Sequence, residues 1–262
     1  RLVEKAFSRG KSTQEKGDAL LDLITTTDNY DDVKGADLVI EAVFENVELK
    51  AKITKMAEAV LDKDAVFGSN TSTLPITGLA EASERPENFI GIHFFSPVER
   101  MGLVEIISGE KTSEATLAKA VDYVLAIRKT PIAVNDSRGF YTSRCFGTYT
   151  REGMEMLAEG IKPAIIENVG RQSGMPMGPL EVSDSVGLDT ALKVTRATAE
   201  AAGIDLQTDD RTQFLAWLVE DQERVGRKAG KGFYDYNEKG KPERLWPDLN
   251  TQLEVKVDEC PP

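Results

Sequence analysis

The chain contains one histidine, His93, within the stretch FIGIHFFSPVERMGLVEII at residues 89–107. An imidazole titrates near neutral pH and can act as a general base, although a histidine on an apolar stretch is often a satisfied core group. Glu105 follows twelve positions later. On an adjacent segment its carboxylate would hold one ring nitrogen and leave the other to accept a proton. The two residues are candidates for a base and its orienting partner, with a surface carboxylate as the alternative for Glu105.

Further polar side chains follow two short apolar runs. EAVFEN places Glu41 and Glu45 after one run, and SNTSTLP places residues 70–73 after the next. The carboxyl ends of parallel strands border the crevice in which open α/β sheets bind ligands, so the carboxylates are expected to face it. A plain turn explains the SNTS group equally well.

The elements that would position these residues alternate between short apolar strands and amphipathic helices. Residues 18–23 are expected to be helical, a helix is expected within 45–66, and another follows Ser113 as its N-cap. Strands are expected over residues 24–27, 35–43, 65–70, 89–95, 104–109 and 130–134. This alternation predicts α/β units around a mostly parallel sheet.

The pattern changes after NDSRGF, near Ser137. Helices separated by Gly/Pro breaks are expected over residues 143–158, 164–172, 190–202 and 212–223. The predicted fold class is therefore α/β followed by all-α. We expect an α/β domain at residues 1–137, a helical domain at 138–240 and a linker or tail at 241–262.

Composition excludes several classes of function. A net charge of −12 argues against nucleic acid or an anionic membrane as the main partner. No apolar run is long enough to span a bilayer, and no signal peptide opens the chain. One histidine and two cysteines give neither a metal cluster nor a disulfide framework, so no metal and a reducing cytoplasm are expected.

Six blocks, in order from residue 39 to residue 236, make the sequence similar to the 3-hydroxyacyl-CoA dehydrogenase family: VIEAVFENVELK, SNTSTLPIT, HFFSPVERMGLVEI, NDSRGFYTSR, MPMGPLEVSD and GRKAGKGFYDY. The sequence most resembles the dehydrogenase part of multifunctional fatty-acid oxidation α-chains. The resemblance implies a Rossmann-type NAD domain, then a helical domain that usually mediates dimerisation. It also implies NAD-dependent oxidation of L-3-hydroxyacyl-CoA to 3-ketoacyl-CoA, by a homodimer or within a multifunctional β-oxidation complex.

The resemblance assigns roles to individual residues. His93 corresponds to the general base, Glu105 to its orienting partner and Ser72 to a group that hydrogen-bonds the substrate oxygen. The positions that resemble cofactor contacts are Glu45, Lys50, Ser96 and Lys228. A basic cluster at the start of the chain could contact the phosphates of coenzyme A, or could be a solvated helix face: Arg1, Lys5, Arg9 and Lys11.

Two departures from the family pattern stand out. Ser143 in GFYTSR occupies the position of a substrate-binding asparagine, so altered binding without loss of activity is expected. The first βαβ portion with its Gly-rich loop is absent, and no GxGxxG occurs in the chain. Without that loop no helix N-terminus cradles a pyrophosphate, so either the chain is a fragment or its NAD binding is impaired.

The alternative is a non-catalytic fragment that serves as a dimerisation or structural module, as the lens λ-crystallins reuse this fold. A structural role does not need Ser72, His93 and Glu105 together, and their joint presence favours the enzyme.

Overall fold

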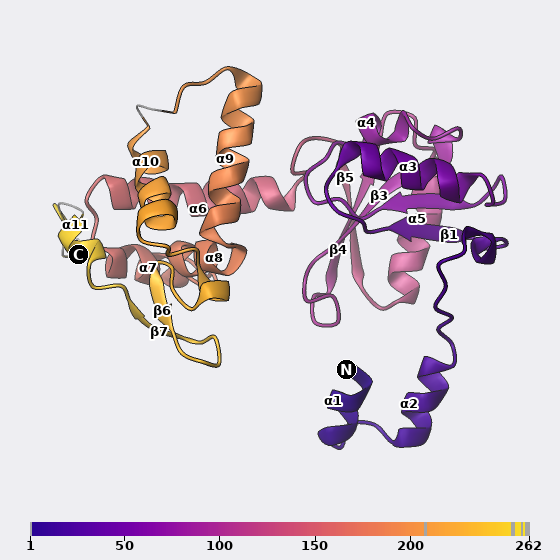
Figure 1. Ribbon diagram of the computed structural model, residues 1–262, viewed down its shortest axis with the longest axis horizontal. Coiled ribbons are helices and arrows are strands. Elements are labelled where there is room, and N and C mark those ends of the chain that lie inside the picture. Colours follow the sequence, from indigo (N-terminus) through magenta and orange to yellow (C-terminus); the bar gives the residue numbers. More distant parts are fainter. Residues whose placement is uncertain (1, 207–208, 253–254, 258, 260–262) are drawn as a thin grey trace. The chain divides into compact units, whose positions relative to one another are not determined.

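The computed structural model describes residues 2–206, 209–252, 255–257 and 259, so Arg1 and Cys260 lie outside the described residues. The chain divides into two compact units, Arg1–Tyr141 and Thr142–Pro262 (Figure 1). Each unit has its own apolar core and is described by itself.

The first unit is built on a five-stranded sheet with the strand order β1-β2-β3-β4-β5. Its strands are β1 (Leu38–Glu41), β2 (Val66–Ser69), β3 (Phe89–Phe94), β4 (Leu103–Ser108) and β5 (Thr130–Asn135). All neighbouring pairs are parallel except β3 and β4, which are antiparallel. The predicted, mostly parallel sheet is confirmed, and β1 forms one of its edges.

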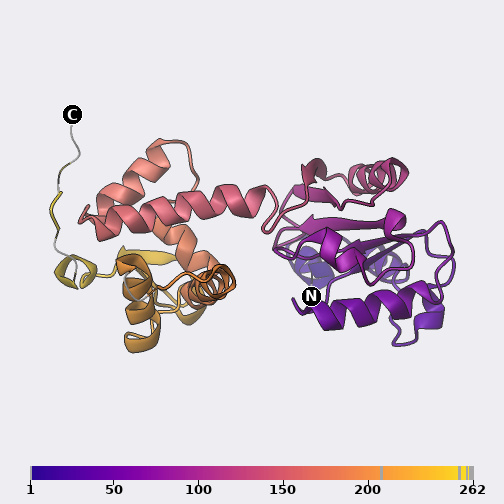
Figure 2. The ribbon, with the colours of Figure 1, turned by 90° about the horizontal axis from the view of Figure 1, so that it is seen from above.

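Helices cover both faces of this sheet (Figure 2). α3 (Val47–Glu58) and α4 (Ile76–Ala80) pack with Phe67 and Phe89 on one face, while α5 (Glu114–Ala126) packs with Ile90 and Ile92 on the other. Successive residues of β3 therefore point to opposite faces, as a strand requires. Ser113 caps α5 as expected, because its side chain accepts from the N–H of Thr116.

Gly91 permits the close approach of α4 to β3. A Cβ atom added there would lie 2.7 Å from Cδ1 of Ile76, which is fully buried. A larger residue at position 91 would push α4 off the sheet, and α4 follows the loop that carries Ser72.

Two helices, α1 (Leu2–Ser8) and α2 (Gln14–Leu21), and a 3₁₀ turn at Tyr30–Val33 precede the sheet, and a second 3₁₀ turn, Pro86–Asn88, leads into β3. The expectation of a strand at residues 24–27 is wrong, because this segment is irregular. Its β-branched residues favour extended backbone, but a strand also needs a neighbour, and no described strand lies beyond β1. The expected helix at 18–23 is part of α2, which ends at Leu21.

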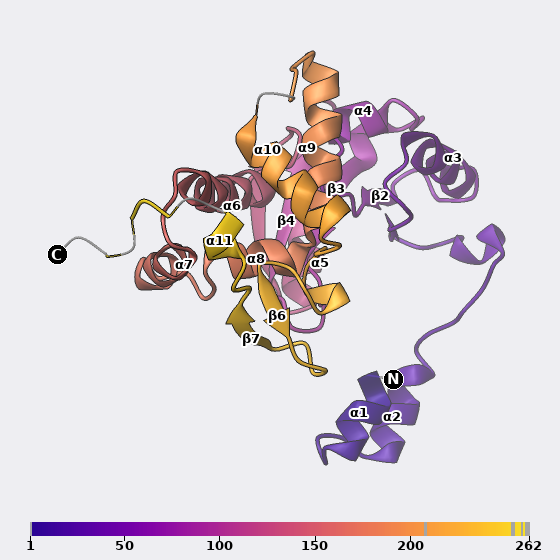
Figure 3. The same cartoon turned by 60° about the vertical axis from the view of Figure 1, so that its left-hand side comes forward.

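The second unit is mainly helical (Figure 3). Its helices are α6 (Thr142–Ala158), α7 (Pro163–Gln172), α8 (Pro179–Val186), α9 (Leu188–Ala202), α10 (Asp210–Ala216) and α11 (Leu249–Gln252), with a π-helical turn at Trp217–Asp221 and a 3₁₀ turn at Arg227–Ala229. A two-stranded antiparallel sheet, β6 (Tyr234–Tyr236) and β7 (Pro242–Leu245), adds to the expected helices. β7 and α11 lie within residues 241–262, the range expected to be a linker.

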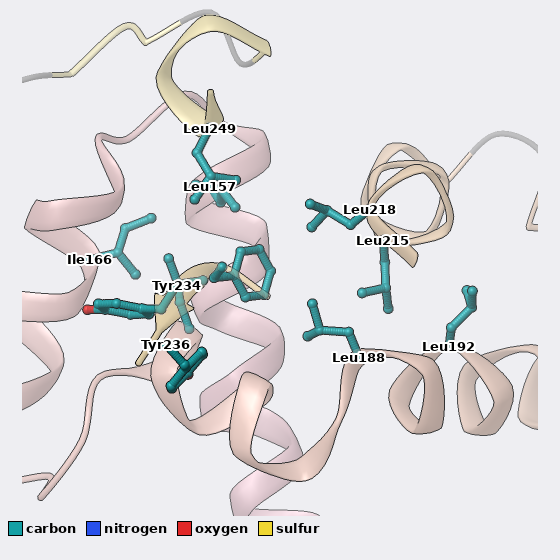
Figure 4. Packing of buried hydrophobic residues seen from close by; sticks show 11 residues of the cluster. Leu157, Ile166, Leu188, Leu192, Leu215, Leu218, Tyr234, Tyr236 and Leu249 are labelled. Atoms are coloured by element: carbon teal, nitrogen blue, oxygen red, sulfur yellow. The ribbon is translucent and has the colours of Figure 1, made fainter. Parts of the chain in front are cut away.

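Apolar side chains from most of these elements meet in one cluster (Figure 4). Leu157, Leu188 and Leu218 from three different helical segments are at most 1% exposed, as is Phe233 beside β6. Leu249 of α11 is also fully buried there, so the chain beyond residue 240 contributes to this core. None of the helices in the described part of the chain has the length and apolar content that a membrane crossing needs.

A buried carboxylate connects α8 to the β6–β7 sheet. Asp184 accepts hydrogen bonds from the N–H groups of Phe233 and Tyr234 at 2.7 and 2.9 Å and from the hydroxyl of Tyr236 at 2.9 Å. Burial is the largest influence on this carboxyl and raises its pKa to about 6, against the lowering effect of the hydrogen bonds. A Cβ atom at Gly232 would overlap Asp184, so only glycine fits this turn.

Candidate active site

His93 and Glu105 form a buried pair near the carboxyl end of β3. They lie directly opposite each other in the antiparallel register of β3 and β4, where opposing side chains share one face of the sheet. Nδ1 of His93 lies 2.7 Å from Oε2 of Glu105. Glu105 is fully buried and His93 is 7% exposed. The twelve-residue spacing thus corresponds to two antiparallel strands and the loop between them.

The pairing sets the tautomer of the imidazole. An ionised carboxylate only accepts hydrogen bonds, so Nδ1 of His93 carries the hydrogen that faces Glu105. In the neutral ring, Nε2 is then the nitrogen with the free lone pair, and the carboxylate stabilises the imidazolium that forms when Nε2 accepts a proton. The pair has the arrangement of a general base with its orienting partner.

Aromatic rings and a strained turn surround the pair. The rings of Phe95 and Phe140 lie 4.5 and 6.1 Å from the imidazole, centroid to centroid. Gly139 and Phe140 have φ angles of +76° and +48°, and this left-handed conformation is rare for a residue such as phenylalanine. The turn brings the N–H of Tyr141 to 3.1 Å from Oε1 of Glu105. Both oxygens of Glu105 are therefore engaged.

Glu45 holds the loop that follows β2. Its Oε1 accepts from the N–H of Ser72 at 2.7 Å and from the Ser72 hydroxyl at 3.0 Å. The hydroxyl of Thr71 lies 3.0 and 2.9 Å from the two carboxylate oxygens. The SNTS group is therefore a turn with a specific carboxylate partner, and Ser72 and Glu45, both candidate site residues, lie together.

Lys50 is only 2% exposed, and its ammonium faces Glu41. Nζ of Lys50 lies 2.9 and 3.1 Å from the oxygens of Glu41 and 3.8 Å from Oε2 of Glu45. Glu41 also accepts from the hydroxyl of Ser69 at 2.8 Å. The expectation that Glu41 faces an open crevice is wrong, because Glu41 is only 4% exposed and its carboxylate balances the buried ammonium.

Two more polar residues lie at the same edge of the sheet. Oδ1 of Asn70, which directly follows β2, accepts from the N–H of Phe94 at 2.8 Å. This bond connects the loop of Ser72 to the residue after His93, because β2 and β3 are parallel neighbours. Ser96 is exposed two residues beyond the end of β3.

The remaining candidate residues lie on other elements. Lys5 is exposed on α1, and Ser143 is half-buried in the first turn of α6. Lys228 is exposed in the 3₁₀ turn of the second unit, and its Nζ lies 2.7 Å from Oδ2 of Asp189. This ion pair holds the pKa of the Asp189 carboxyl below its usual value.

Sequence reasoning missed the contacts of Tyr141 and Asp189. Tyr141 acts through its backbone N–H, a group that every residue except proline has, so its type gives no signal. Asp189 pairs with Lys228 across 39 positions, and no spacing rule covers such a distance. The described residues contain no group of three or more His, Cys, Asp or Glu side chains that could hold a metal ion.

The first unit fits a dinucleotide only in part. The half-exposed carboxylate of Glu45 suits a ribose hydroxyl, and the polar groups lie at the carboxyl edge of the sheet. The N-termini of α3 and α4 are already capped, because Asn46 accepts from Leu49 and Asp136 accepts from Ile76 and Thr77. These helix ends therefore leave no open amide cradle for a pyrophosphate.

A mostly parallel sheet domain with a histidine–carboxylate pair at its carboxyl edge, followed by a helical domain, has the organisation of a two-domain dehydrogenase. The chain belongs to the 3-hydroxyacyl-CoA dehydrogenase family: residues 1–137 match the family model of its NAD binding domain, and residues 139–236 match that of its C-terminal domain.

The relatives of this chain include longer proteins. It is 41% identical over 256 residues to the fatty acid oxidation complex subunit alpha of Shewanella halifaxensis, covering 98% of this chain and 36% of that protein. The corresponding subunit of Shewanella loihica is 41% identical over 241 residues, covering 92% and 34% of the two chains. The chain thus spans about a third of the length of these curated relatives.

Solved structures share the fold. The (S)-3-hydroxybutyryl-CoA dehydrogenase of Ralstonia eutropha superposes with a TM-score of 0.80 and 34% identity, covering 90% of this chain and 83% of that chain. The dehydrogenase part of multifunctional enzyme 1 from C. elegans gives a TM-score of 0.64 and 26% identity, covering 98% and 58%.

Proposed function

We propose that the protein oxidises L-3-hydroxyacyl-CoA to 3-ketoacyl-CoA with NAD, as a step of fatty-acid β-oxidation. The observation that carries this proposal is the buried His93–Glu105 pair, with Nδ1 and Oε2 2.7 Å apart. Membership of the family and the names of the relatives support the same reaction. A structural module would need no such pair, because an ionisable pair buried in a sheet adds little stability.

In this proposal His93 accepts the proton of the substrate hydroxyl at Nε2, and Glu105 stabilises the resulting imidazolium. General-base assistance of this kind typically contributes about 10²–10⁴ in rate. Ser72 hydrogen-bonds the substrate oxygen and fixes the carbinol against His93. NAD, when bound, supplies the hydride acceptor.

The other candidate residues complete the two binding sites. We assign Glu45, Lys50, Ser96 and Lys228 to the cofactor side, and Ser143 and Lys5 to the acyl-CoA. Lys50 can act only through its neighbours, because its ammonium is buried against Glu41. In this assignment residues 1–137 bind the cofactor and residues 138–240 mediate dimerisation, while residues 241–262 add β7 and α11 to the helical domain.

The proposed setting is a homodimer or a multifunctional β-oxidation complex in the cytoplasm. The relatives named as subunits of fatty acid oxidation complexes support the complex. The two cysteines of the chain, too few for a disulfide framework, support a reducing compartment.

The test of the reaction is His93→Gln in the full-length gene product, assayed by NADH formation from a 3-hydroxyacyl-CoA. Turnover is expected to fall by about 10²–10⁴ while the thermal unfolding temperature stays the same. Arg100→Gln, in the exposed β3–β4 loop, is the matched control and is expected to behave as wild type. Near-normal turnover of His93→Gln would sink the proposal.

A second experiment concerns the cofactor. We expect the 262-residue chain on its own to bind NAD weakly, because the N-termini of α3 and α4 are capped by side chains. Calorimetric titration with NAD measures this directly. Tight binding by the 262-residue chain would contradict the expectation.

A further inference from the structure

Glu45 makes more contacts with the protein than a residue dedicated to a ligand needs. Its carboxylate accepts from the Ser72 amide, the Ser72 hydroxyl and the Thr71 hydroxyl, with distances between 2.7 and 3.0 Å. Hydrogen bonds to an ionised acceptor are stronger than those between neutral groups. The position of Ser72 is therefore set by a side chain that lies 27 residues earlier in the chain.

A buried charge fixes Glu45 in turn. Nζ of Lys50 lies 3.8 Å from Oε2 of Glu45, and the Lys50 side chain is 2% exposed. Lys50 cannot turn outward without leaving the buried carboxylate of Glu41 uncompensated, which is costly. Glu41 is held by the N–H of Val43 at 2.6 Å and by the hydroxyl of Ser69 at 2.8 Å. The charged residues of β1 and α3 thus form a rigid support behind Glu45.

The direction of the Ser72 hydrogen bond follows from the charge of its partner. A carboxylate only accepts, so the hydroxyl hydrogen of Ser72 points to Glu45. The oxygen lone pairs of Ser72 then remain for other partners. The single hydrogen of the substrate hydroxyl goes to His93 in the proposed reaction, so Ser72 contacts the substrate oxygen by turning its own hydroxyl hydrogen from Glu45 to that oxygen, while its backbone N–H stays bound to Glu45 at 2.7 Å.

We propose that Glu45 is a positioning residue for Ser72, with Lys50 as the charge that holds Glu45 in place. The inference rests on the proposed function, in which Ser72 contacts the substrate oxygen. It adds to that function a role for Glu45 in placing the substrate, in addition to any contact of Glu45 with the cofactor.

A double-mutant cycle tests the inference in the full-length gene product. Glu45→Ala and Ser72→Ala are each expected to lower kcat/KM for a 3-hydroxyacyl-CoA by about tenfold, the effect of one charge-assisted hydrogen bond. With NAD saturating, so that any contact of Glu45 with the cofactor does not limit the rate, the double variant is expected to be no worse than Ser72→Ala alone, because the positioning effect of Glu45 acts through Ser72. Multiplicative losses in the double variant would overturn the proposal. Glu48→Ala, an exposed acid in the first turn of α3, is the matched control.

Hydrogen exchange followed by mass spectrometry gives a readout without turnover. In wild type the hydrogen bond to Glu45 protects the Ser72 amide from exchange. The peptide that covers residues 70–75 is therefore expected to exchange at least tenfold faster in Glu45→Ala and at the wild-type rate in Glu48→Ala. Glu45→Gln keeps a carbonyl acceptor, so the exchange rate of this peptide in Glu45→Gln is expected to lie between the rates in Glu45→Ala and Glu48→Ala. Peptides from β3 serve as the folding control, and unchanged exchange at residues 70–75 would overturn the proposal.

The two proposals fail differently. If Ser72→Ala leaves turnover unchanged, the proposed role of Ser72 in the reaction fails, while faster exchange in Glu45→Ala still supports the positioning. If Ser72→Ala lowers turnover and Glu45→Ala changes neither exchange nor kcat/KM, the positioning fails and the reaction stands.

Discussion

Glu105 and Tyr141 are joined by a hydrogen bond of 3.1 Å from the backbone N–H of Tyr141 to Oε1 of the carboxylate. The other oxygen of Glu105 holds Nδ1 of His93 at 2.7 Å. Tyr141 is the last residue of the first unit, and α6 begins at Thr142. The same buried carboxylate thus orients the histidine and anchors the backbone from which the chain passes to the second unit.

The first prediction concerns this carboxylate. Glu105→Gln keeps the volume of the side chain but removes the charge that favours imidazolium, so kcat is expected to fall by about tenfold or more. The loss is expected not to exceed that of His93→Gln, since Glu105 acts through the histidine. Steady-state kinetics of the full-length gene product measure it. Glu110→Gln, an exposed acid just after β4, is the control, and wild-type kcat in Glu105→Gln would refute the orienting role.

The second prediction concerns the glycine against Asp184. Gly232→Ala is expected to destabilise the second unit by about 2 kcal/mol or more, because its Cβ would overlap a buried carboxylate that cannot move without losing its hydrogen bonds. The matched variant is Gly147→Ala in α6, where a Cβ meets nothing within 4 Å. Gly147→Ala is expected to stabilise the second unit by up to about 1 kcal/mol, because alanine has a higher helix propensity than glycine.

Tryptophan fluorescence during urea unfolding measures both glycine variants. The two tryptophans of the chain, Trp217 and Trp246, lie in the second unit with ring centroids 5.7 Å apart, so the signal reports that unit. Equal urea midpoints for Gly232→Ala and Gly147→Ala would contradict the packing argument.

The third prediction concerns pH. Burial raises the pKa of Asp184 to about 6 from a reference of 3.8. The folded state therefore holds this proton at pH values where the unfolded chain has lost it. The resulting stability is fully present below about pH 4 and is lost as the pH rises through about 6. At 1.36 kcal/mol per pKa unit, the difference between these values amounts to about 3 kcal/mol.

The pH prediction is checked by urea unfolding between pH 4.5 and 7.5. The buried Glu167, whose pKa burial also raises, acts in the same direction, so single variants must be compared. Asp184→Asn is expected to be less stable throughout, since it loses an acceptor, but its stability should fall less with rising pH. Glu200→Gln, exposed on α9, should keep the wild-type slope. An identical slope in Asp184→Asn would show that this carboxyl stays ionised in the folded state.

Much of the first unit could be predicted because its signals are local. Strands β1 to β5 and helices α3 and α5 follow from short-range apolar periodicity, and Ser113 marks the start of α5. Residues 24–27 have the composition of a strand, but composition cannot say whether a neighbouring strand exists. The contact between α8 and the β6–β7 sheet depends on hydrogen bonds from Asp184 to partners about fifty positions later in the chain. A local sequence pattern cannot predict such a contact.

The candidate site also contains contacts that could be predicted from the sequence and contacts that could not. The His93–Glu105 contact could be anticipated, because a twelve-residue separation allows two antiparallel strands and a loop. The burial of Lys50 could not, because a lysine at helical spacing among other charged residues usually faces solvent. What decides its place is Glu41 on the neighbouring strand, and sequence alone does not show which of two nearby carboxylates takes the ammonium.

The position of β1 at the end of the strand order also affects how the isolated chain behaves in solution. One side of Leu38–Glu41 pairs with β2, and no described strand covers the other. The free amide and carbonyl groups of such an edge strand can form backbone hydrogen bonds with another extended segment, including the edge strand of a second molecule. Preparations of this chain alone should therefore self-associate as they are concentrated, and light scattering over a series of concentrations measures this association.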